Sequence, residues 1–519
     1  MRNHLVGAIA VMAMCAASLA AEPTCPRVVS GKVFLDGNKN GTLDPGEKGV
    51  SGVRITDGVE FVTTAADGAY TIRISDDPTF PYRPAQTVSV CWPTGTWPSG
   101  EWWVRLSNVK DAASVDFGLR KDVQKVPFVF LHMTDPHEFF NNGNEHFLEW
   151  MNAMPTDVKF MIDTGDTYRP KAVEKPYKLT FITAVGNHDT WELAKPPKDP
   201  DDGGYGPFTK RLGPVRWSFD CAGIHFVGVD VIEQRKQSAM IDWLAKDLAS
   251  VKPGTRVVMA YHYPDPGGDP RFVKLLRDHK VELILGGHGH AYAYSEDGPV
   301  PLLTAYHWQP PGTCNVLAVS DKGIAHGVYC LGCKWKQKAL GAHSRRCPVR
   351  WADHVLVPQI RKLFGTKRTL EAGALQGKQT VTLTEPHVLV RGKIALGRAQ
   401  RIVVRIGPAQ KPLEIAYDGR RLVVDGTNFP FAPRPAQKTL DLTVFVHHKM
   451  LTLWANNFFF IEKSVPLTKA TAVTLAAEGG PATVESMTVQ EIKPDPANRS
   501  TSYFCPCAHG AVRRVPLPR

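Results

Sequence analysis

The chain has 519 residues, of which 43% are hydrophobic and 22% charged, and its formal net charge is +12. This length predicts about three domains, and the apolar content suffices for several cores, which excludes a disordered protein. The positive charge favours anionic partners such as phosphate esters, although a diffuse basic surface without a partner is the alternative. No arginine-rich run or interleaved aromatic pattern gives a specific signal for nucleic acid.

Residues 1–21 have the pattern of a signal peptide. Arg2 supplies a positive charge, Leu5 to Ala17 form a short apolar stretch, and Ser18-Leu19-Ala20 offers a small-residue cleavage site. We therefore expect an exported protein, either periplasmic or secreted. No later stretch is long and apolar enough to cross a bilayer, so no membrane span is expected.

Residues 22–120 alternate short apolar segments with turns, which predicts a small β-sandwich. The expected strands are 28–35, 50–56, 70–74, 87–91 and 114–119.

Residues 36–47, between the first two of these strands, match the spacing of a twelve-residue calcium loop. The expected oxygen donors are Asp36, Asn38, Asn40, Thr42, Asp44 and Glu47. A calcium loop between strands resembles the prealbumin-like B repeats of bacterial surface adhesins. The alternative is a turn rich in Asn and Gly that binds no ion.

Between residues 121 and 335, polar side chains follow five apolar segments at the points where the segments end. Open α/β sheets bind their ligands at the carboxyl ends of the strands, so we expect these side chains to converge. The segments are 128–133, 158–162, 180–185, 256–260 and 281–285. The side chains that follow them are Asp135, His137, Asp166, Asn187, His188, Asp189, His262, His288 and His290. Imidazole, carboxylate and amide donors suit divalent Mn, Fe or Zn.

The ordered set Asp-x-His, Gly-Asp, Gly-Asn-His-Asp, His and Gly-His-x-His resembles the calcineurin-like metallophosphoesterase family. The resemblance implies a central α/β domain made of a two-sheet β-sandwich flanked by helices. It also implies two metal ions bridged by Asp166. The first ion would lie on Asp135, His137, Asp166 and His290, and the second on Asp166, Asn187, His262 and His288.

In the family pattern, His188 is a non-ligand histidine beside the leaving group, and Asp189 would hold its ring through a hydrogen bond. The implied reaction is hydrolysis of phosphate mono- or diesters by a hydroxide that bridges two cations about 3.5–4 Å apart. His188 would then protonate or stabilise the leaving group. Arg169 is a candidate for holding the substrate phosphate through its bidentate guanidinium, and a carbohydrate-linked ester is one candidate substrate.

The alternative function is a surface or carbohydrate-binding protein whose phosphoesterase core is inactive. The intact set of ligand positions favours the enzyme. An iron-tyrosinate centre of the purple acid phosphatase type is disfavoured, because Arg169 and His137 occupy the places of its tyrosine and glycine.

Apolar residues recur at helical spacing in 145–154 and 238–251, which predicts two crossover helices. Asp269 and Pro270 supply a cap and a first-turn proline for a third helix. The Cys/basic linker 336–369 follows the phosphoesterase segment.

The ten cysteines, nine after removal of the signal peptide, favour disulfides in an exported protein. The candidates for pairing are Cys314, Cys330, Cys333 and Cys347. The alternative is a structural zinc site, because Cys330, Cys333, His343 and Cys347 have a metal-ligand spacing.

Residues 370–492 alternate strands without helices, which predicts an antiparallel β-sandwich. The expected strands are 380–384, 388–395, 401–406, 413–417, 421–424, 440–446, 451–454 and 473–477. Segments 414–418, 440–446 and 451–457 resemble the C-terminal lectin-like sandwich of the invertase, levanase and fructanase family. His447 and His448 replace that family's Asp-Arg, and both carbohydrate binding and interdomain packing are open as roles. Residues 493–519 are expected to be a flexible tail.

Overall fold

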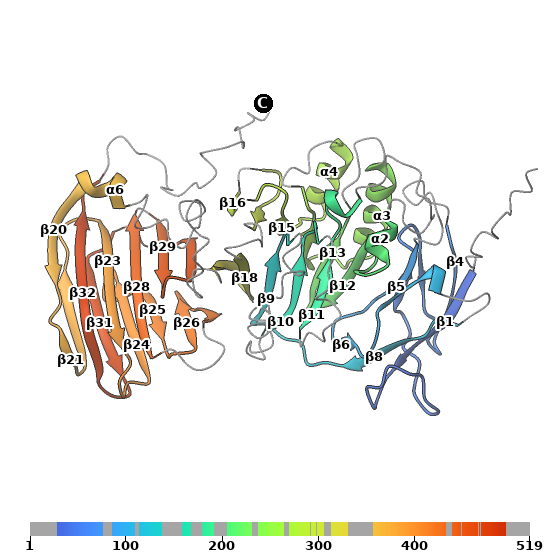
Figure 1. Cartoon of the computed structure of the whole chain (residues 1–519), viewed down its shortest axis with the longest axis horizontal. Coiled ribbons are helices and arrows are strands. Elements are labelled where there is room, and N and C mark those ends of the chain that lie inside the picture. Colours follow the sequence, from blue (N-terminus) through green and yellow to red (C-terminus); the bar gives the residue numbers. More distant parts are fainter. Residues whose placement is uncertain are drawn as a thin grey trace, which may run out of the picture.

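The computed structural model contains two β-sandwiches on either side of a central α/β unit (Figure 1). It describes residues 28–75, 86–108, 114–136, 158–167, 179–190, 205–230, 237–263, 269–290, 292–296, 298–305, 313–330, 357–431, 438–447, 449–465, 467 and 469–494. Among these residues, no helix is long and apolar enough to cross a membrane.

The N-terminal sandwich consists of two four-stranded sheets, with strand orders β4-β1-β8-β6 and β3-β2-β5-β7. Its elements are β1 (Val28–Leu35), β2 (Arg54–Thr56), β3 (Phe61–Thr63), β4 (Ala69–Arg73), β5 (Thr87–Cys91), β6 (Thr96–Pro98), β7 (Trp103–Arg105), η2 (Leu106–Asn108) and β8 (Phe117–Lys121). Val29 and Val33 of β1 face the core together with Ile55 of β2. The predicted N-terminal sandwich is thus confirmed, and β3, β6 and β7 add three-residue strands that are too short to show a periodic pattern.

The central unit packs two sheets face to face. Its elements are β9 (Phe128–Met133), β10 (Val158–Asp163), β11 (Thr180–Thr183), η5 (Asn187–Thr190), α2 (Gly206–Thr209), β12 (Trp217–Cys221), β13 (Ile224–Gly228), α3 (Gln237–Ala249), β14 (Arg256–Ala260), α4 (Pro270–Asp278), β15 (Leu283–Gly286), β16 (Ala293–Ser295), β17 (Leu302–Thr304), β18 (Thr313–Ser320) and β19 (Gly323–Cys330). Phe130 and Phe160 from one sheet meet Phe226 from the other, with ring centroids 5.4 and 5.1 Å away.

Both sheets of the central unit contain parallel neighbours, β9-β10-β11 in one and β13-β14-β15-β17 in the other. The carboxyl ends of parallel strands lie at the same edge of a sheet, so the loops that follow β9, β10, β11, β14 and β15 are brought together. This fold class is the α/β sandwich that the sequence predicts.

Two of the predicted helices are present as α3 and α4. Met240, Leu244 and Leu248 of α3 are fully buried, in agreement with their helical spacing. The Asp269 carboxylate accepts a hydrogen bond from the Arg271 backbone at 2.9 Å, so the predicted cap of α4 is confirmed. The helix expected at 145–154 lies outside the described residues.

The N-terminal sandwich meets the central unit through tryptophan side chains. Trp92 stacks on Phe219 of β12 at 4.5 Å, and Trp97 stacks on Phe160 of β10 at 5.9 Å. The Trp97 indole also donates a hydrogen bond to Thr180 Oγ1 at 2.9 Å. The two units therefore share one continuous apolar core.

A charge network around the buried Asp247 crosses the same junction. Arg54 of β2 donates to Asp247 Oδ1 of α3 at 2.8 Å. His225 of β13 donates from Nε2 to Asp247 Oδ2 and from Nδ1 to Asp220 Oδ1, both at 2.8 Å. Burial lowers the pKa of His225, but the negative charges of Asp247 and Asp220 outweigh it and raise the pKa to about 9. His225 is therefore a cation at neutral pH, and Asp247 pairs with two cations at once.

The C-terminal sandwich packs a six-stranded sheet, with order β22-β31-β24-β25-β26-β27, against part of a twelve-stranded sheet. Its elements are α6 (Val357–Ile360), η11 (Arg361–Leu363), β20 (Phe364–Thr369), β21 (Gly373–Leu375), β22 (Lys378–Thr382), β23 (His387–Ala395), β24 (Arg401–Ile406), β25 (Leu413–Tyr417), β26 (Arg421–Val424), β27 (Thr427–Pro430), β28 (Thr439–His447), β29 (Met450–Ala455), β30 (Phe459–Ser464), β31 (Ala472–Glu478) and β32 (Ala482–Ile492). The predicted C-terminal sandwich is confirmed, but its first strand, β20, lies within the predicted linker 336–369 and pairs with β32.

The twelve-stranded sheet runs from the central unit into the C-terminal sandwich without a break, in the order β11-β10-β9-β18-β19-β30-β29-β28-β23-β32-β20, with β21 paired to β32. The join is between β19 and β30, which pair antiparallel with Val328 opposite Phe460. The Cys330 N–H donates to the Phe458 carbonyl at 2.7 Å. Gly327 makes the close approach possible, because a Cβ there would lie 2.9 Å from the Phe459 ring.

One cysteine expectation is corrected by the fold. Cys314 is a buried free thiol, so the predicted disulfide group does not include it. In the β18–β19 pair, Cys314 lies opposite Tyr329 and Cys330 lies opposite Thr313, so the two cysteine side chains point to opposite faces of the sheet. Cys333, His343 and Cys347 lie outside the described residues, and the zinc alternative stays a prediction.

Candidate metal centre

The predicted ligands, apart from His137, come together at the carboxyl edge of the central strands. Asp135 follows β9, Asp166 follows β10 and Asn187 begins η5 after β11. His262 follows β14, while His288 and His290 follow β15. His137 and the candidate phosphate-binding Arg169 lie outside the described residues.

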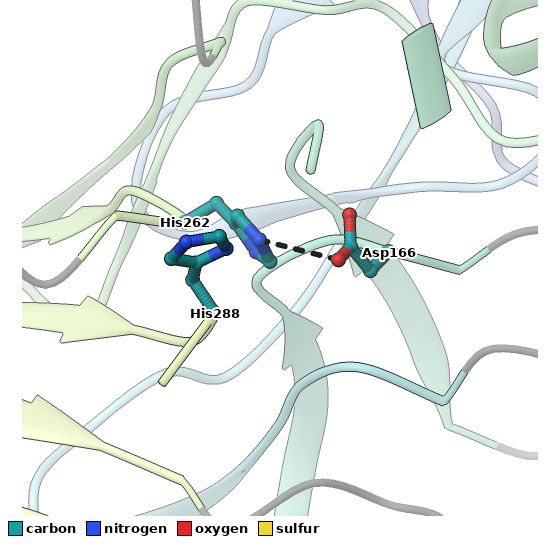
Figure 2. Close-up of side chains that lie close together, drawn as sticks. All are labelled: Asp166, His262 and His288. Atoms are coloured by element: carbon teal, nitrogen blue, oxygen red, sulfur yellow. Dashed lines mark ion pairs between the residues drawn. The ribbon is translucent and has the colours of Figure 1, made fainter. Parts of the chain in front are cut away.

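Asp166, His262 and His288 form the centre of this group (Figure 2). One ligand atom from each lies within 4.8 Å of the others, and His262 Nε2 is 3.4 Å from Asp166 Oδ2. Figure 2 shows the two imidazole rings on one side and the Asp166 carboxylate on the other, with one oxygen turned toward His262. An ion between them would have a carboxylate and two imidazoles as donors.

Asp135 and His290 form the adjacent part of the site. His290 Nε2 lies 3.0 Å from Asp135 Oδ1. The other oxygen of Asp135 accepts hydrogen bonds from the Thr134 hydroxyl at 2.7 Å and the His288 backbone at 3.0 Å. Asp135 thereby connects the loop after β9 to the loop after β15.

The His262 ring is fixed through both of its nitrogens. Nδ1 donates to the Thr164 carbonyl at 2.7 Å, which leaves Nε2 directed into the site. Nε2 lies 3.0 Å from Asn187 Oδ1, so the amide of η5 reaches the same point. A backbone carbonyl behind a ligating imidazole is a common way to set its tautomer and orientation.

Four of these residues have a backbone conformation that L-amino acids rarely adopt. The φ angles are 51° for Asp135, 58° for Asp166, 61° for His288 and 48° for His290. Such residues cost of order 1–3 kcal/mol each and gather at functional sites, where the surrounding structure holds them. The strained backbone at these four positions lets loops from different strands bring their side chains into one site.

The charges at the site raise the pKa of His262 and lower the pKa of Asp135. Burial alone would lower the pKa of the His262 ring, but contact with the Asp166 carboxylate raises it to about 9. Burial would raise the pKa of Asp135, yet the hydrogen bond with His290 and the nearby imidazoles hold it well below its ordinary value. The Asp135 carboxylate is thus held ionised beside the imidazoles.

The donor set fits a divalent transition metal on an observation independent of the motif. Asp166 Oδ2 is buried and has no hydrogen-bond donor among the described residues, although it points toward His262. A buried carboxylate oxygen without a partner is costly, and a cation between it and the imidazoles would remove that cost.

The two predicted catalytic residues lie near different groups of Asp166, His188 near its carboxylate and Asp189 at its backbone N–H. His188 is 36% exposed, and its Nε2 is 3.8 Å from Asp166 Oδ2. Asp189 is buried, and its Oδ2 accepts hydrogen bonds from the backbones of Gly186 at 2.8 Å and Asp166 at 2.9 Å. The predicted bond from Asp189 to the His188 ring is not among these and stays a prediction.

The structure adds Thr134 and Thr164 as residues that hold the ligands. Neither carries a sequence signal of its own, because Thr134 acts through a hydroxyl next to Asp135 and Thr164 through a backbone carbonyl. Thr134 could have been suspected only from its place between a strand and a ligand.

The calcium-loop residues are described, and they form a compact turn. The Asp36 carboxylate accepts from the Lys39 and Gly41 backbones, while Asn38 and Asn40 donate to Asp44 Oδ2. Glu47 Oε1 and Oε2 accept from the backbones of Gly37 and Asp44. The Thr42 N–H donates to Asn40 Oδ1. Calcium binding by this loop stays a prediction.

Comparison with known proteins identifies the central unit. A two-sheet α/β sandwich with Asp, Asn and His at the carboxyl strand ends is the architecture of a metallophosphoesterase. Residues 128–292 match the family of calcineurin-like phosphoesterases, so this part of the chain is a calcineurin-like phosphoesterase domain. No curated protein matches the chain in sequence.

Three solved structures are each similar to less than half of this chain. Vacuolar protein sorting 29 from Cryptosporidium parvum is 14% identical and matches 40% of this chain and 92% of its own, with a TM-score of 0.24. A predicted phosphoesterase from Streptococcus pneumoniae is 13% identical and matches 40% and 91%, with a TM-score of 0.24. A beta-fructofuranosidase from Aspergillus kawachii is 19% identical over 27% of this chain and 30% of its own, with a TM-score of 0.21.

Proposed function

We propose that this protein is an exported, metal-dependent phosphoesterase that hydrolyses phosphate mono- or diesters with two divalent transition metal ions. The observation that carries the proposal is the buried Asp166 Oδ2, which lacks a hydrogen-bond donor among the described residues and faces His262 and His288. Membership of residues 128–292 in a phosphoesterase family supports it.

The ligand assignment is part of the proposal. Asp166, Asn187, His262 and His288 would hold one ion, and Asp135, His137, Asp166 and His290 the other. Two bound cations would neutralise the phosphoryl oxygens and lower the pKa of a bound water. Mn, Fe and Zn all suit these donors.

The protein's own residues have separable tasks in this proposal. Asp166 would be the shared ligand, with one oxygen 3.4 Å from His262 Nε2, and Thr164 holds the His262 ring so that Nε2 faces the site. His188, which is partly exposed and has its Nε2 3.8 Å from Asp166 Oδ2, would donate a proton to the departing alkoxide, an effect worth about 10²–10⁴ in rate.

The test is a panel of chromogenic mono- and diesters assayed on purified protein with Mn²⁺, Fe²⁺ or Zn²⁺, together with metal analysis. We expect turnover in the unmodified protein and loss of both turnover and most bound metal in Asp166→Asn, because the shared charge is removed. Bound metal without turnover on any ester would favour the inactive-core alternative. Normal metal content and turnover in Asp166→Asn would contradict the site.

His188→Asn distinguishes acid catalysis from metal binding. We expect this variant to keep both metals. Its rate of hydrolysis should fall far more for alkyl esters than for nitrophenyl esters, whose leaving group needs little protonation. Loss of metal, or equal slowing of both ester classes, would rule out the proton-donor role.

Export is proposed from the signal-peptide pattern of residues 1–21. The N-terminal sequence of the mature protein, taken from cell fractions, tests it. We expect a start near Glu22, and a chain that retains Met1 inside the cell would contradict export.

A further inference from the structure

The side chain of Asp189 connects two of the metal-binding loops, although it lies outside the proposed ligand set. Its Oδ2 accepts one hydrogen bond from the Gly186 backbone in its own loop and one from the Asp166 backbone in the neighbouring loop, at 2.8 and 2.9 Å. Asp189 is only 7% exposed, so water does not compete for these bonds.

The side chain of Asp166 in turn contacts the backbone of the loop that carries Asp189. Its Oδ1 accepts a hydrogen bond from the His188 backbone at 2.7 Å. Each loop thus supplies one carboxylate that binds a backbone N–H of the other. Because Oδ1 is occupied in this way, Oδ2 is the oxygen left to face His262, as Figure 2 shows.

The backbones of the two loops lie so close together that neither Gly165 nor Gly186 could carry a side chain. A Cβ on Gly165 would lie 2.3 Å from the Gly186 nitrogen, and a Cβ on Gly186 would lie 2.2 Å from the Asp166 nitrogen. Asp166 itself has a φ of 58°, an unfavourable conformation that needs support from its surroundings. The bond from its N–H to Asp189 supplies that support.

We propose that Asp189 is a positioning residue that fixes which oxygen of Asp166 faces the metals, by accepting hydrogen bonds from the Asp166 and Gly186 backbones. This inference rests on the proposed function, since it concerns the orientation of the proposed bridging ligand. It gives Asp189 a task that is independent of the His188 ring.

The test compares Asp189→Ala with Asp189→Asn in the full chain, using calorimetric titration with Mn²⁺. Asp189→Ala removes the acceptor, and we expect Mn²⁺ affinity to fall about 10–100-fold, as for other groups that orient ligands. Asp189→Asn keeps a carbonyl oxygen that can accept both bonds, so we expect it to restore most of the affinity. Both nitrophenyl and alkyl esters should slow equally in Asp189→Ala.

A matched control comes from Asp57 in the N-terminal sandwich. This residue is 1% exposed, and its carboxylate accepts from the backbones of Val59, Glu60 and Ser75 at 2.7–2.9 Å. Asp57→Ala should lower the melting temperature while leaving Mn²⁺ affinity unchanged. The control separates general loss of stability from loss of ligand orientation.

Three outcomes overturn the proposal while leaving the function intact. The first is unchanged Mn²⁺ affinity in Asp189→Ala. The second is an equal loss in Asp189→Asn, which would mean that charge and not hydrogen bonding matters. The third is slower hydrolysis of alkyl esters alone, which would mean that Asp189 acts by orienting the His188 ring. Absence of Mn²⁺ binding and of turnover in the unmodified protein would instead contradict the proposed function itself.

Discussion

The N-terminal and C-terminal sandwiches are joined to the central unit by different kinds of contact. The N-terminal junction consists mainly of side-chain contacts, with tryptophans stacked on phenylalanines and Arg54 paired with Asp247. One backbone hydrogen bond, from the Asp220 N–H to the Trp92 carbonyl at 2.9 Å, adds to them. The C-terminal junction is built on backbone pairing between β19 and β30, with apolar contacts such as Tyr292 against Phe460 beside it. A junction made of particular side chains can be broken by one substitution, whereas a backbone junction tolerates most side chains and depends on close approach.

Among changes at the two junctions, removal of the Asp247 side chain should lower the free energy of unfolding the most. Asp247→Ala leaves the buried His225 and the partly exposed Arg54 without their shared partner, and we expect a loss of about 3–5 kcal/mol. The urea midpoint of the first unfolding transition measures it. The exposed pair of Lys246 and Glu60 is the control, since Glu60→Ala should cost less than about 1 kcal/mol. A small effect of Asp247→Ala would mean that the apolar contacts alone hold the junction.

The pH dependence of stability should report the same network. The folded pKa of His225, about 9, lies above its ordinary value of 6.5, so the folded protein binds the proton more tightly than the unfolded chain. This stabilisation is complete below about pH 6.5 and is lost as the pH rises through about 9, by a few kcal/mol.

Thermal melting across this range tests the expectation, with Arg54, Asp220 and Asp247 as the charges that face the ring. In His225→Gln the decline should be much shallower, because no proton is lost. An identical decline in both proteins would place its origin elsewhere.

At the C-terminal junction, a substitution of Gly327 should lower the stability of the protein. Gly327→Ala places a methyl group 2.9 Å from the Phe459 ring, and we expect a loss of about 1–3 kcal/mol as β30 shifts. Gly298→Ala is the matched control, since its Cβ would meet only ordinary contact at 3.5 Å. Equal melting temperatures for the two variants would show that the junction adjusts without strain.

Calcium should give the smallest of these effects. An ion bound by the folded loop 36–47 alone would stabilise the protein by about 1.4 kcal/mol at ten times its Kd. Because the N-terminal sandwich shares a core with the central unit, we expect the melting temperature of the whole chain to rise, and Asp36→Ala to abolish the rise. An equal rise in that variant would exclude the loop as the site.

The strand ends and their ligands could be predicted because each is a local pattern. An apolar segment followed by Asp166 or His262 can be seen in the sequence, and parallel strands bring such ends together wherever they lie in the chain. The roles of Thr164 and the Asp189 oxygen could not be predicted, because they depend on backbone groups that come together only in three dimensions.

Other strands were missed for identifiable reasons. In β32 the alternation of buried and exposed residues is interrupted beside a bulge opposite Lys393 and Ile394, so no period of two is visible. In β30 three buried residues, Phe459 to Ile461, stand in a row, because that strand joins two parts of one sheet. The charge network of Asp247 also gave no local signal, since its members are far apart in sequence.

The pairing of β19 with β30 also determines how the chain could be shortened. Without the C-terminal sandwich, β19 would become an edge strand with a row of unpaired backbone groups, flanked by the apolar side chains of Val328 and Tyr329. Such an edge is a template for pairing with other chains. We expect a chain truncated after residue 335 to self-associate. The C-terminal sandwich would then protect the phosphoesterase domain from aggregation whether or not it binds a ligand.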